Sequence, residues 1–203
     1  MDITPYGFES FRLQGKTIDL LINPVDGSKV GWKAPRIEPE LILTTSEKDY
    51  TDLSRAKGEV MTFDRPGEYE IHGAKIRGLQ AGSSVTAYVM ELDDLSVAYL
   101  GEIADTPSDV LLEAASDADV LFVPVGGGDV LSAKGAAEIV SQISPKIVIP
   151  THYKTKELKL SGYEALDPFL KEIGIKPRTE GRLKVTRRDL PEELELVVLE
   201  PGK

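Results

Sequence analysis

Short apolar runs dominate the first half of the chain. They predict strands at residues 17–22, 41–43, 60–63, 68–71, 74–79, 85–92 and 95–100, and turn residues such as Asn23-Pro24, Arg65-Pro66-Gly67 and His72-Gly73 separate several of them. The N-terminal segment predicts one strand before them. Asp93-Asp94 separates the last two runs and predicts a β-hairpin.

In the second half, capped helical segments alternate with short apolar runs. Three helices are predicted: one from the N-cap Thr106 to about residue 116, one over residues 132–143, and one over residues 168–173 behind Asp167 as its cap. The apolar runs predict strands at residues 119–123, 146–149, 183–185 and 195–199. No linker or repeat divides the chain, so the pattern predicts one layered α/β domain over residues 1–203.

Composition narrows the classes of partner. The formal net charge is -10, which disfavours nucleic acid, and the basic stretch at residues 182–188 (RLKVTRR) is interpreted as a solvated strand beside acidic residues. The absence of cysteine excludes disulfides and thiolate metal ligands and fits a cytoplasmic location. No apolar run reaches 18 residues and the N-terminus lacks a signal-peptide pattern, so we expect no membrane span. The expected partner is a small molecule or another protein.

Four segments at strand ends carry the chemistry-bearing side chains, namely residues 6–11, 44–52, 100–102 and 150–153. Their order and content resemble the metallo-β-lactamase-fold superfamily, in particular its Zn-dependent hydrolases of the ascorbate-6-phosphate lactonase type. The matching segments are Gly7 to Phe11, Ile22-Asn23-Pro24, Pro66 to Glu70, Gly78-Leu79, Leu100-Gly101-Glu102, Pro124 to Gly127 and Pro150 to Tyr153. The resemblance covers nearly the whole chain and implies a four-layered αββα sandwich.

The resemblance also implies where metal ligands should lie, and most of them are replaced. The family's His-x-His-x-Asp-His loop supplies two neighbouring divalent ions. Four of the family's histidine positions carry other residues: Thr45, Glu47, Tyr50 and Gly82. Glu102 replaces the bridging aspartate, whereas Asp49 and His152 are retained. The motif is therefore degenerate, and we expect no active dinuclear hydrolase.

One weak mononuclear site survives in this alignment, formed by Asp49, Glu102 and His152, with Glu47 nearby. Its oxygen-rich ligands would favour Mn²⁺ or Mg²⁺ over Zn²⁺. A neutral Tyr50 phenol would ligate poorly. The favoured expectation is that no cofactor is bound.

Each of these residues also has a structural interpretation. His152 can be a hydrogen-bonded structural group, Asp49 can cap a short helix near residues 51–53 or bind loop amides, and Glu102 can pair with a basic group such as Lys48. Glu47 can form a surface pair with the same lysine. Residues 126–128 (GGG) lack the lysine of a phosphate-binding loop and are interpreted as a close backbone turn beside the site.

Three functions remain open. The first is a non-catalytic metallo-β-lactamase-fold protein that acts by binding or assembly. The second is a residual mononuclear hydrolase of phosphoesters or lactones. The third is a metal-free small-molecule module whose pocket is walled by Tyr6, Tyr50 and Tyr153.

Overall fold

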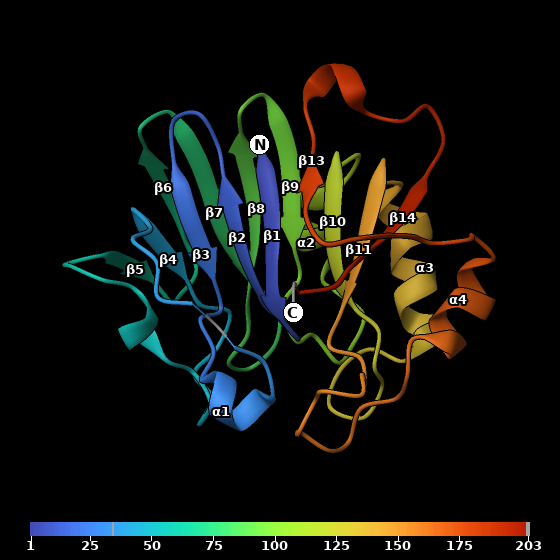
Figure 1. Ribbon diagram of the computed structural model, residues 1–203. Helices are drawn as coiled ribbons and strands as arrows, with labels where there is room; N and C mark the ends of the chain where they lie inside the picture. The colour runs from blue at the N-terminus through green and yellow to red at the C-terminus, as the bar shows by residue number, and fades with distance from the viewer. Residues whose placement is uncertain (34, 202–203) are drawn as a thin grey trace.

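Two β-sheets face each other in a computed structural model that describes residues 1–33 and 35–201 (Figure 1). One sheet has the strand order β13-β1-β2-β3-β4-β5 and the other β12-β14-β11-β10-β9-β8-β7-β6. The strands of the first are β1 (Asp2–Gly7), β2 (Ser10–Gln14), β3 (Asp19–Ile22), β4 (Leu41–Leu43), β5 (Met61–Phe63) and β13 (Leu183–Lys184). The strands of the second are β6 (Gly67–Ile71), β7 (Ala74–Gln80), β8 (Thr86–Leu92), β9 (Leu95–Tyr99), β10 (Val120–Pro124), β11 (Ile147–Thr151), β12 (Arg178–Glu180) and β14 (Glu195–Leu199).

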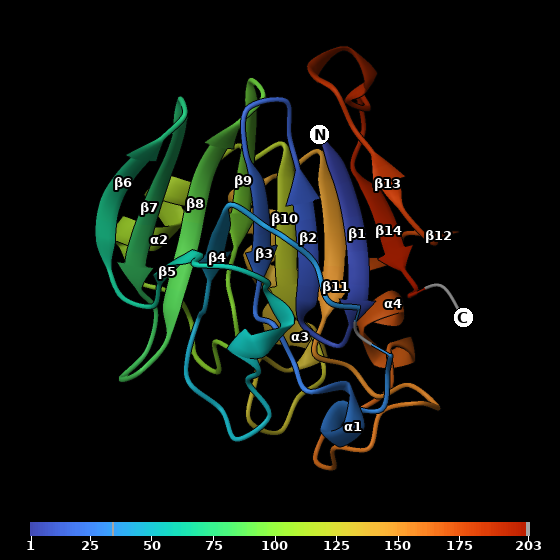
Figure 2. The ribbon, with the colours of Figure 1, turned by 60° about the vertical axis from the view of Figure 1, so that its left-hand side comes forward.

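Helices cover the outer face of the eight-stranded sheet (Figure 2). They are α2 (Asp109–Ala115), α3 (Ala133–Ile143) and α4 (Asp167–Ile173). Among the described residues, the segments that connect β3 to β5 contain only the short α1 (Gly27–Val30) and η1 (Leu53–Arg55), and η2 (Arg187–Asp189) follows β13. The predicted αββα sandwich is thus confirmed, with little helix on the side of the six-stranded sheet.

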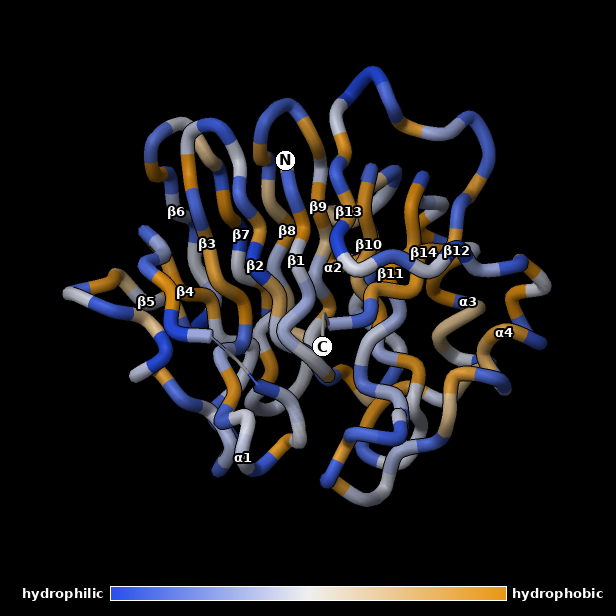
Figure 3. The backbone as a smooth tube through the Cα atoms, in the orientation of Figure 1, coloured by the Kyte–Doolittle hydropathy of each residue, from blue (hydrophilic) through white to orange (hydrophobic). Residues whose placement is uncertain are grey.

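Burial on both sides explains why the central strands are apolar throughout. Every residue of β10 and β11 is buried, and these strands are mostly orange in Figure 3. Phe122 and Ile149 belong to the core between the sheets, whereas Leu121 and Val148 belong to the core beneath the helices. On β1, burial alternates from residue to residue, because only one face of that strand packs against the core.

Most predicted elements are found within two residues of their expected ends. The hairpin at Asp93-Asp94 is confirmed, and both residues have the positive φ that a tight two-residue turn requires. The helix predicted from Thr106 instead starts at Asp109, because the Ser108 side chain accepts from the Leu111 backbone N–H.

The N-cap predicted for α4 was also wrong. Asp167 is the first residue of α4 and provides no capping hydrogen bond. The strands β2 and β12 and the helix α1 were not predicted at all. These elements are three to five residues long, too short to show a clear hydrophobic period.

Parallel pairing brings several strand ends to one edge of the sandwich. Strand β3 pairs parallel to β4, and β10 pairs parallel to both β9 and β11. Their carboxyl ends, together with the β1–β2 turn, carry the four segments singled out from the sequence. Among the described residues, no helix is long and apolar enough to cross a membrane.

Candidate functional site: a buried Glu-Glu-His centre

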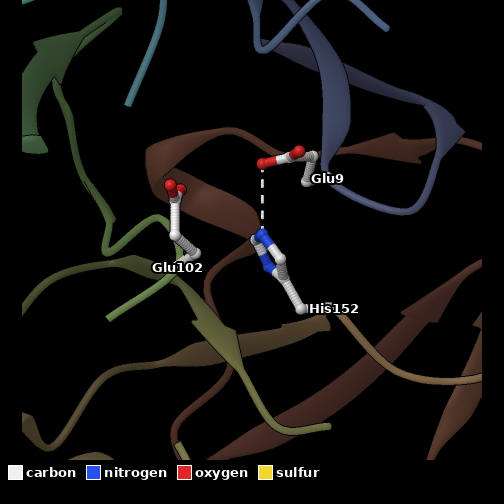
Figure 4. A group of neighbouring side chains, drawn as sticks. All are labelled: Glu9, Glu102 and His152. Atoms are coloured by element: carbon white, nitrogen blue, oxygen red, sulfur yellow. Dashed lines mark hydrogen bonds and ion pairs between the residues drawn. The ribbon is translucent and has the colours of Figure 1, made fainter. Parts of the chain in front are cut away.

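Three ligand-type side chains converge at this edge of the sandwich. Glu9 comes from the β1–β2 turn, Glu102 follows β9, and His152 follows β11 (Figure 4). Their nearest carboxylate and imidazole atoms all lie within 4.8 Å of one another, and their exposed fractions are only 3%, 8% and 1%. They are the only such group of three or more among the described residues.

The backbone around the centre is strained at three positions. Phe8, Asn23 and His152 all have φ between 45° and 55°, a region that costs a non-glycine residue about 1–3 kcal/mol. The three lie at the ends of β1, β3 and β11. Next to them, a Cβ at Gly126 would lie 1.8 Å from the His152 carbonyl oxygen. The expectation that a glycine lets the backbone turn closely beside the site therefore fits this position.

Glu9 accepts hydrogen bonds from two other chain segments. The Asn23 side-chain amide donates to its Oε2 at 2.7 Å, and His152 Nε2 lies 3.1 Å from the same atom. When Glu9 is an ionised carboxylate it can only accept, so Nε2 is the donor in that state. The other ring nitrogen of His152 lies 2.9 Å from the Thr151 hydroxyl. Both ring nitrogens of His152 are thus engaged within the protein.

Glu102 is held by the loop that follows β4. Thr45 donates its hydroxyl to Oε2 at 2.8 Å, Ser46 donates to Oε1, and the Lys48 ammonium lies 3.1 Å from Oε1. Burial alone would raise the pKa of Glu102, but Ser46, His152, Lys48 and Thr45 together lower it below its usual value. Glu102 is therefore an ionised carboxylate whose charge is balanced by Lys48. Its two oxygens accept hydrogen bonds from Thr45 and Ser46.

The two acidic groups are joined by one further bridge. The Asn23 amide also donates to the Thr45 hydroxyl at 2.9 Å, and its carbonyl oxygen accepts from the Thr45 backbone N–H at 2.8 Å. Tyr99 donates its hydroxyl to the Glu9 backbone carbonyl at 2.6 Å. The centre is thus a continuous network of hydrogen bonds that connects both sheets.

Aromatic rings cover this network. The Phe8 ring makes edge contacts with His152 and Tyr163, both at 4.9 Å between centroids, and with Tyr50 at 6.2 Å. Phe8 and Tyr50 belong to a small separate hydrophobic cluster with Val25, Val30 and Leu158. Burial and the charge of Glu9 raise the pKa of Tyr50, and similar causes raise that of Tyr163 to about 12. Both phenols are therefore neutral near pH 7.

The residues singled out from the sequence only partly converge. Glu102 and His152 lie together, but the side chain of Asp49 is 86% exposed and its Oδ2 lies 3.9 Å from Lys29 Nζ. Glu47 and Gly82 are exposed as well. Thr45 and Tyr50 are buried beside the centre as a hydrogen-bond donor and an aromatic cover. The predicted pairing of Glu102 with Lys48 is confirmed.

Sequence reasoning missed Glu9. The signal was an acidic residue inside the Gly7 to Phe11 turn, in a segment otherwise composed of apolar and small residues. A charged side chain in a turn is normally solvated, so only the tertiary structure showed that this one is buried.

The donor set does not fit the pair of zinc ions that the fold family uses. Two such ions need several imidazoles between them, and His152 is the only histidine within the described centre. One divalent ion is a closer fit, because three protein ligands are common in catalytic metal sites and two carboxylates suit a hard ion. Each of the three side chains already has hydrogen-bond partners within the protein, however.

A pocket of about 640 Å³, lined in part by Phe8, lies beside the centre's aromatic cover. Its walls include the aromatic rings of Trp32, Tyr153, Phe8 and Phe11, and Lys33, Lys156, Glu157 and Asp167 add charges. The predicted common wall of three tyrosines is not formed there. Tyr153 lines this pocket, whereas Tyr50 packs over the centre and Tyr6 lies beside Arg12.

Two facing sheets with helices outside and a polar centre at the strand ends define a metallo-β-lactamase-type fold. Residues 2–152 match the family described as the β-lactamase superfamily domain, a stretch that contains all three residues of the centre. The chain belongs to the metallo-β-lactamase superfamily.

Named relatives agree with this assignment. A UPF0173 protein of Pyrococcus abyssi is 39% identical over 76% of this chain and 84% of its own. A UPF0173 metal-dependent hydrolase of Methanopyrus kandleri is 21% identical over 100% of this chain and 98% of its own length. A more local match, 39% identical, covers 38% of this chain and 33% of a UPF0173 protein of Pyrococcus furiosus. A crystal structure from Thermotoga maritima, proposed to be a Zn-dependent hydrolase of this superfamily, has 27% identity and a TM-score of 0.86 over 99% of both chains.

Proposed function

We propose that this chain is a metallo-β-lactamase-fold protein that has no metal pair and acts by binding a small molecule or another protein. One observation carries the proposal: the centre contains a single imidazole, and Glu9, Glu102 and His152 are all bonded to other groups of the chain. Bound metal lowers the pKa of water to about 7. Without a metal pair, the centre has no comparable means of forming a hydroxide nucleophile.

The pocket beside Phe8 supports a binding role. Its volume of about 640 Å³ falls within the range of about 300–1,000 Å³ that is usual for small-molecule sites. Aromatic rings with polar tips, such as Trp32 and Tyr153, provide both contact area and hydrogen bonding. The pocket needs no metal to bind a ligand.

Metal analysis tests the proposal directly. Protein purified without chelators should contain far less than one transition-metal ion per chain, and added Zn²⁺ should produce no hydrolysis of phosphoester or lactone substrates. One or more bound ions per chain, or zinc-dependent turnover, would refute it. The T. maritima homologue, expressed and purified in parallel, is the positive control for metal loading.

A second function is favoured by one specific observation, the mutual approach of Glu9, Glu102 and His152 to within 4.8 Å. These residues could hold one hard ion and make the chain a mononuclear metal-dependent hydrolase, as the name of the M. kandleri relative suggests. A near-stoichiometric ion that is lost in both Glu9→Gln and His152→Ala would establish this alternative. Binding that survives both substitutions would exclude this centre as the site.

A further inference from the structure

The Lys48 side chain reaches from the loop after β4 to the buried centre. This loop aligns with the metal-binding loop of the fold family, and its Lys48 ammonium lies 3.1 Å from Glu102 Oε1. The lysine side chain is 39% exposed and the glutamate 8% exposed. A protein cation is therefore paired with the carboxylate that replaces the family's bridging aspartate.

The charges of the centre depend on this lysine. Glu9 and Glu102 bring two negative charges, and Lys48 neutralises one of them. A divalent ion is bound more tightly as the number of negatively charged ligands increases. It would also have to compete with the ammonium for the lone pairs of Glu102, in a buried place where electrostatic repulsion is weakly screened.

We infer that Lys48 is an internal cation that takes the place of a metal ion, and that its removal opens a single-ion site formed by Glu9, Glu102 and His152. This inference rests on the proposed function, in which the unmodified centre is free of metal. The ion expected is a hard one such as Mn²⁺, because two of the three ligands are carboxylates.

The test is calorimetric titration of the full chain with MnCl₂. Lys48→Met keeps the apolar stem but removes the charge, and Lys48→Gln is a second variant in case the first misfolds. We expect no saturable binding by the unmodified protein at millimolar Mn²⁺ and at least about tenfold tighter binding by either variant. The gain should disappear in the double variant Lys48→Met/His152→Ala.

Thermal unfolding gives an independent measurement. Loss of the ammonium should lower the Tm of Lys48→Met, because Glu102 then lacks its cation, and MnCl₂ should raise the Tm again by mass action. Lys48→Arg retains the charge and should behave like the unmodified protein. Lys75→Ala removes a similar but exposed pair with Glu91 and should not create Mn²⁺ binding.

The two ideas fail in different ways. Stoichiometric Mn²⁺ in the unmodified protein would overturn the proposed function. If the unmodified protein is metal-free but folded Lys48→Met and Lys48→Gln bind Mn²⁺ no more tightly, only the inference about Lys48 is overturned. Tighter binding that persists in the double variant would likewise overturn it, because the ion would then occupy another place.

Discussion

His152 Nε2 lies 3.1 Å from Glu9 Oε2, although 143 positions separate the two residues along the chain. Glu9 belongs to the six-stranded sheet's β1–β2 turn, and His152 follows β11 of the other sheet. The pair therefore joins the two layers at the edge where the fold family places its metals. A buried pair of this kind makes the centre important for stability whether or not an ion is present.

Removal of the Glu9 carboxylate should destabilise the protein. Glu9→Ala would leave the Asn23 amide and His152 Nε2 without their acceptor, and an unpaired group in a buried ionic site costs about 3–5 kcal/mol. Glu9→Gln should cost less, about 1 kcal/mol, because the amide oxygen can still accept. Urea unfolding measures both.

Glu91→Ala is the matched control, because its pair with Lys75 is exposed and screened by solvent and should contribute little to stability. Equal losses for Glu9→Ala and Glu91→Ala would show that the buried pair has no special role.

Alkaline pH should destabilise the protein through Tyr50. Burial and the charge of Glu9 raise the pKa of this phenol in the folded state above its ordinary value of 10.0. Since the folded-state pKa is the higher one, the stabilisation is fully present below about pH 10 and is lost as pH rises beyond it. Unfolding free energies measured from pH 8 to 11 should fall less steeply for Tyr50→Phe than for the unmodified protein. Parallel curves would contradict the assignment.

Trp32 should report binding in the pocket beside Phe8. It is the only tryptophan in the chain and it lines that pocket, so an aromatic ligand bound there should change its emission. In a titration with aromatic fragments, Tyr153→Ala should weaken each bound fragment by about tenfold, as expected for the loss of one aromatic wall worth roughly 1.4 kcal/mol. Lys75→Ala, outside the pocket, should leave the affinity unchanged. Unaltered binding by Tyr153→Ala would mean that the fragments bind elsewhere.

Gly126→Ala should be strongly destabilising. Its Cβ would lie 1.8 Å from the His152 carbonyl oxygen, so the backbone beside the centre would have to move. We expect a loss of more than about 2 kcal/mol in urea unfolding. Gly58→Ala is the comparison, because no heavy atom lies within 4 Å of its Cβ and only the strain of its positive φ is added. Comparable losses in the two variants would show that the neighbouring backbone relieves the close contact at Gly126 at little cost.

Hydrophobic period and turn residues were sufficient to predict most strands, all three longer helices and the edge at which the chemistry lies. These features are local, because the spacing of apolar residues directly reflects the period of a strand or helix. The sequence alone also showed the shortage of imidazoles, since the whole chain has only two histidines.

Only the tertiary structure showed which side chains point into the centre and which point into solvent. Asp49 looked like a retained ligand but lies in solvent beside Lys29, and Glu9 looked like an ordinary turn residue but is buried against His152. Glu9 meets His152 because two sheets stack whose contacting residues are far apart in sequence. The sequence by itself determined that the chain has only two histidines, because composition needs no fold; only the packing of the sheets decided that Glu9, Glu102 and His152 meet.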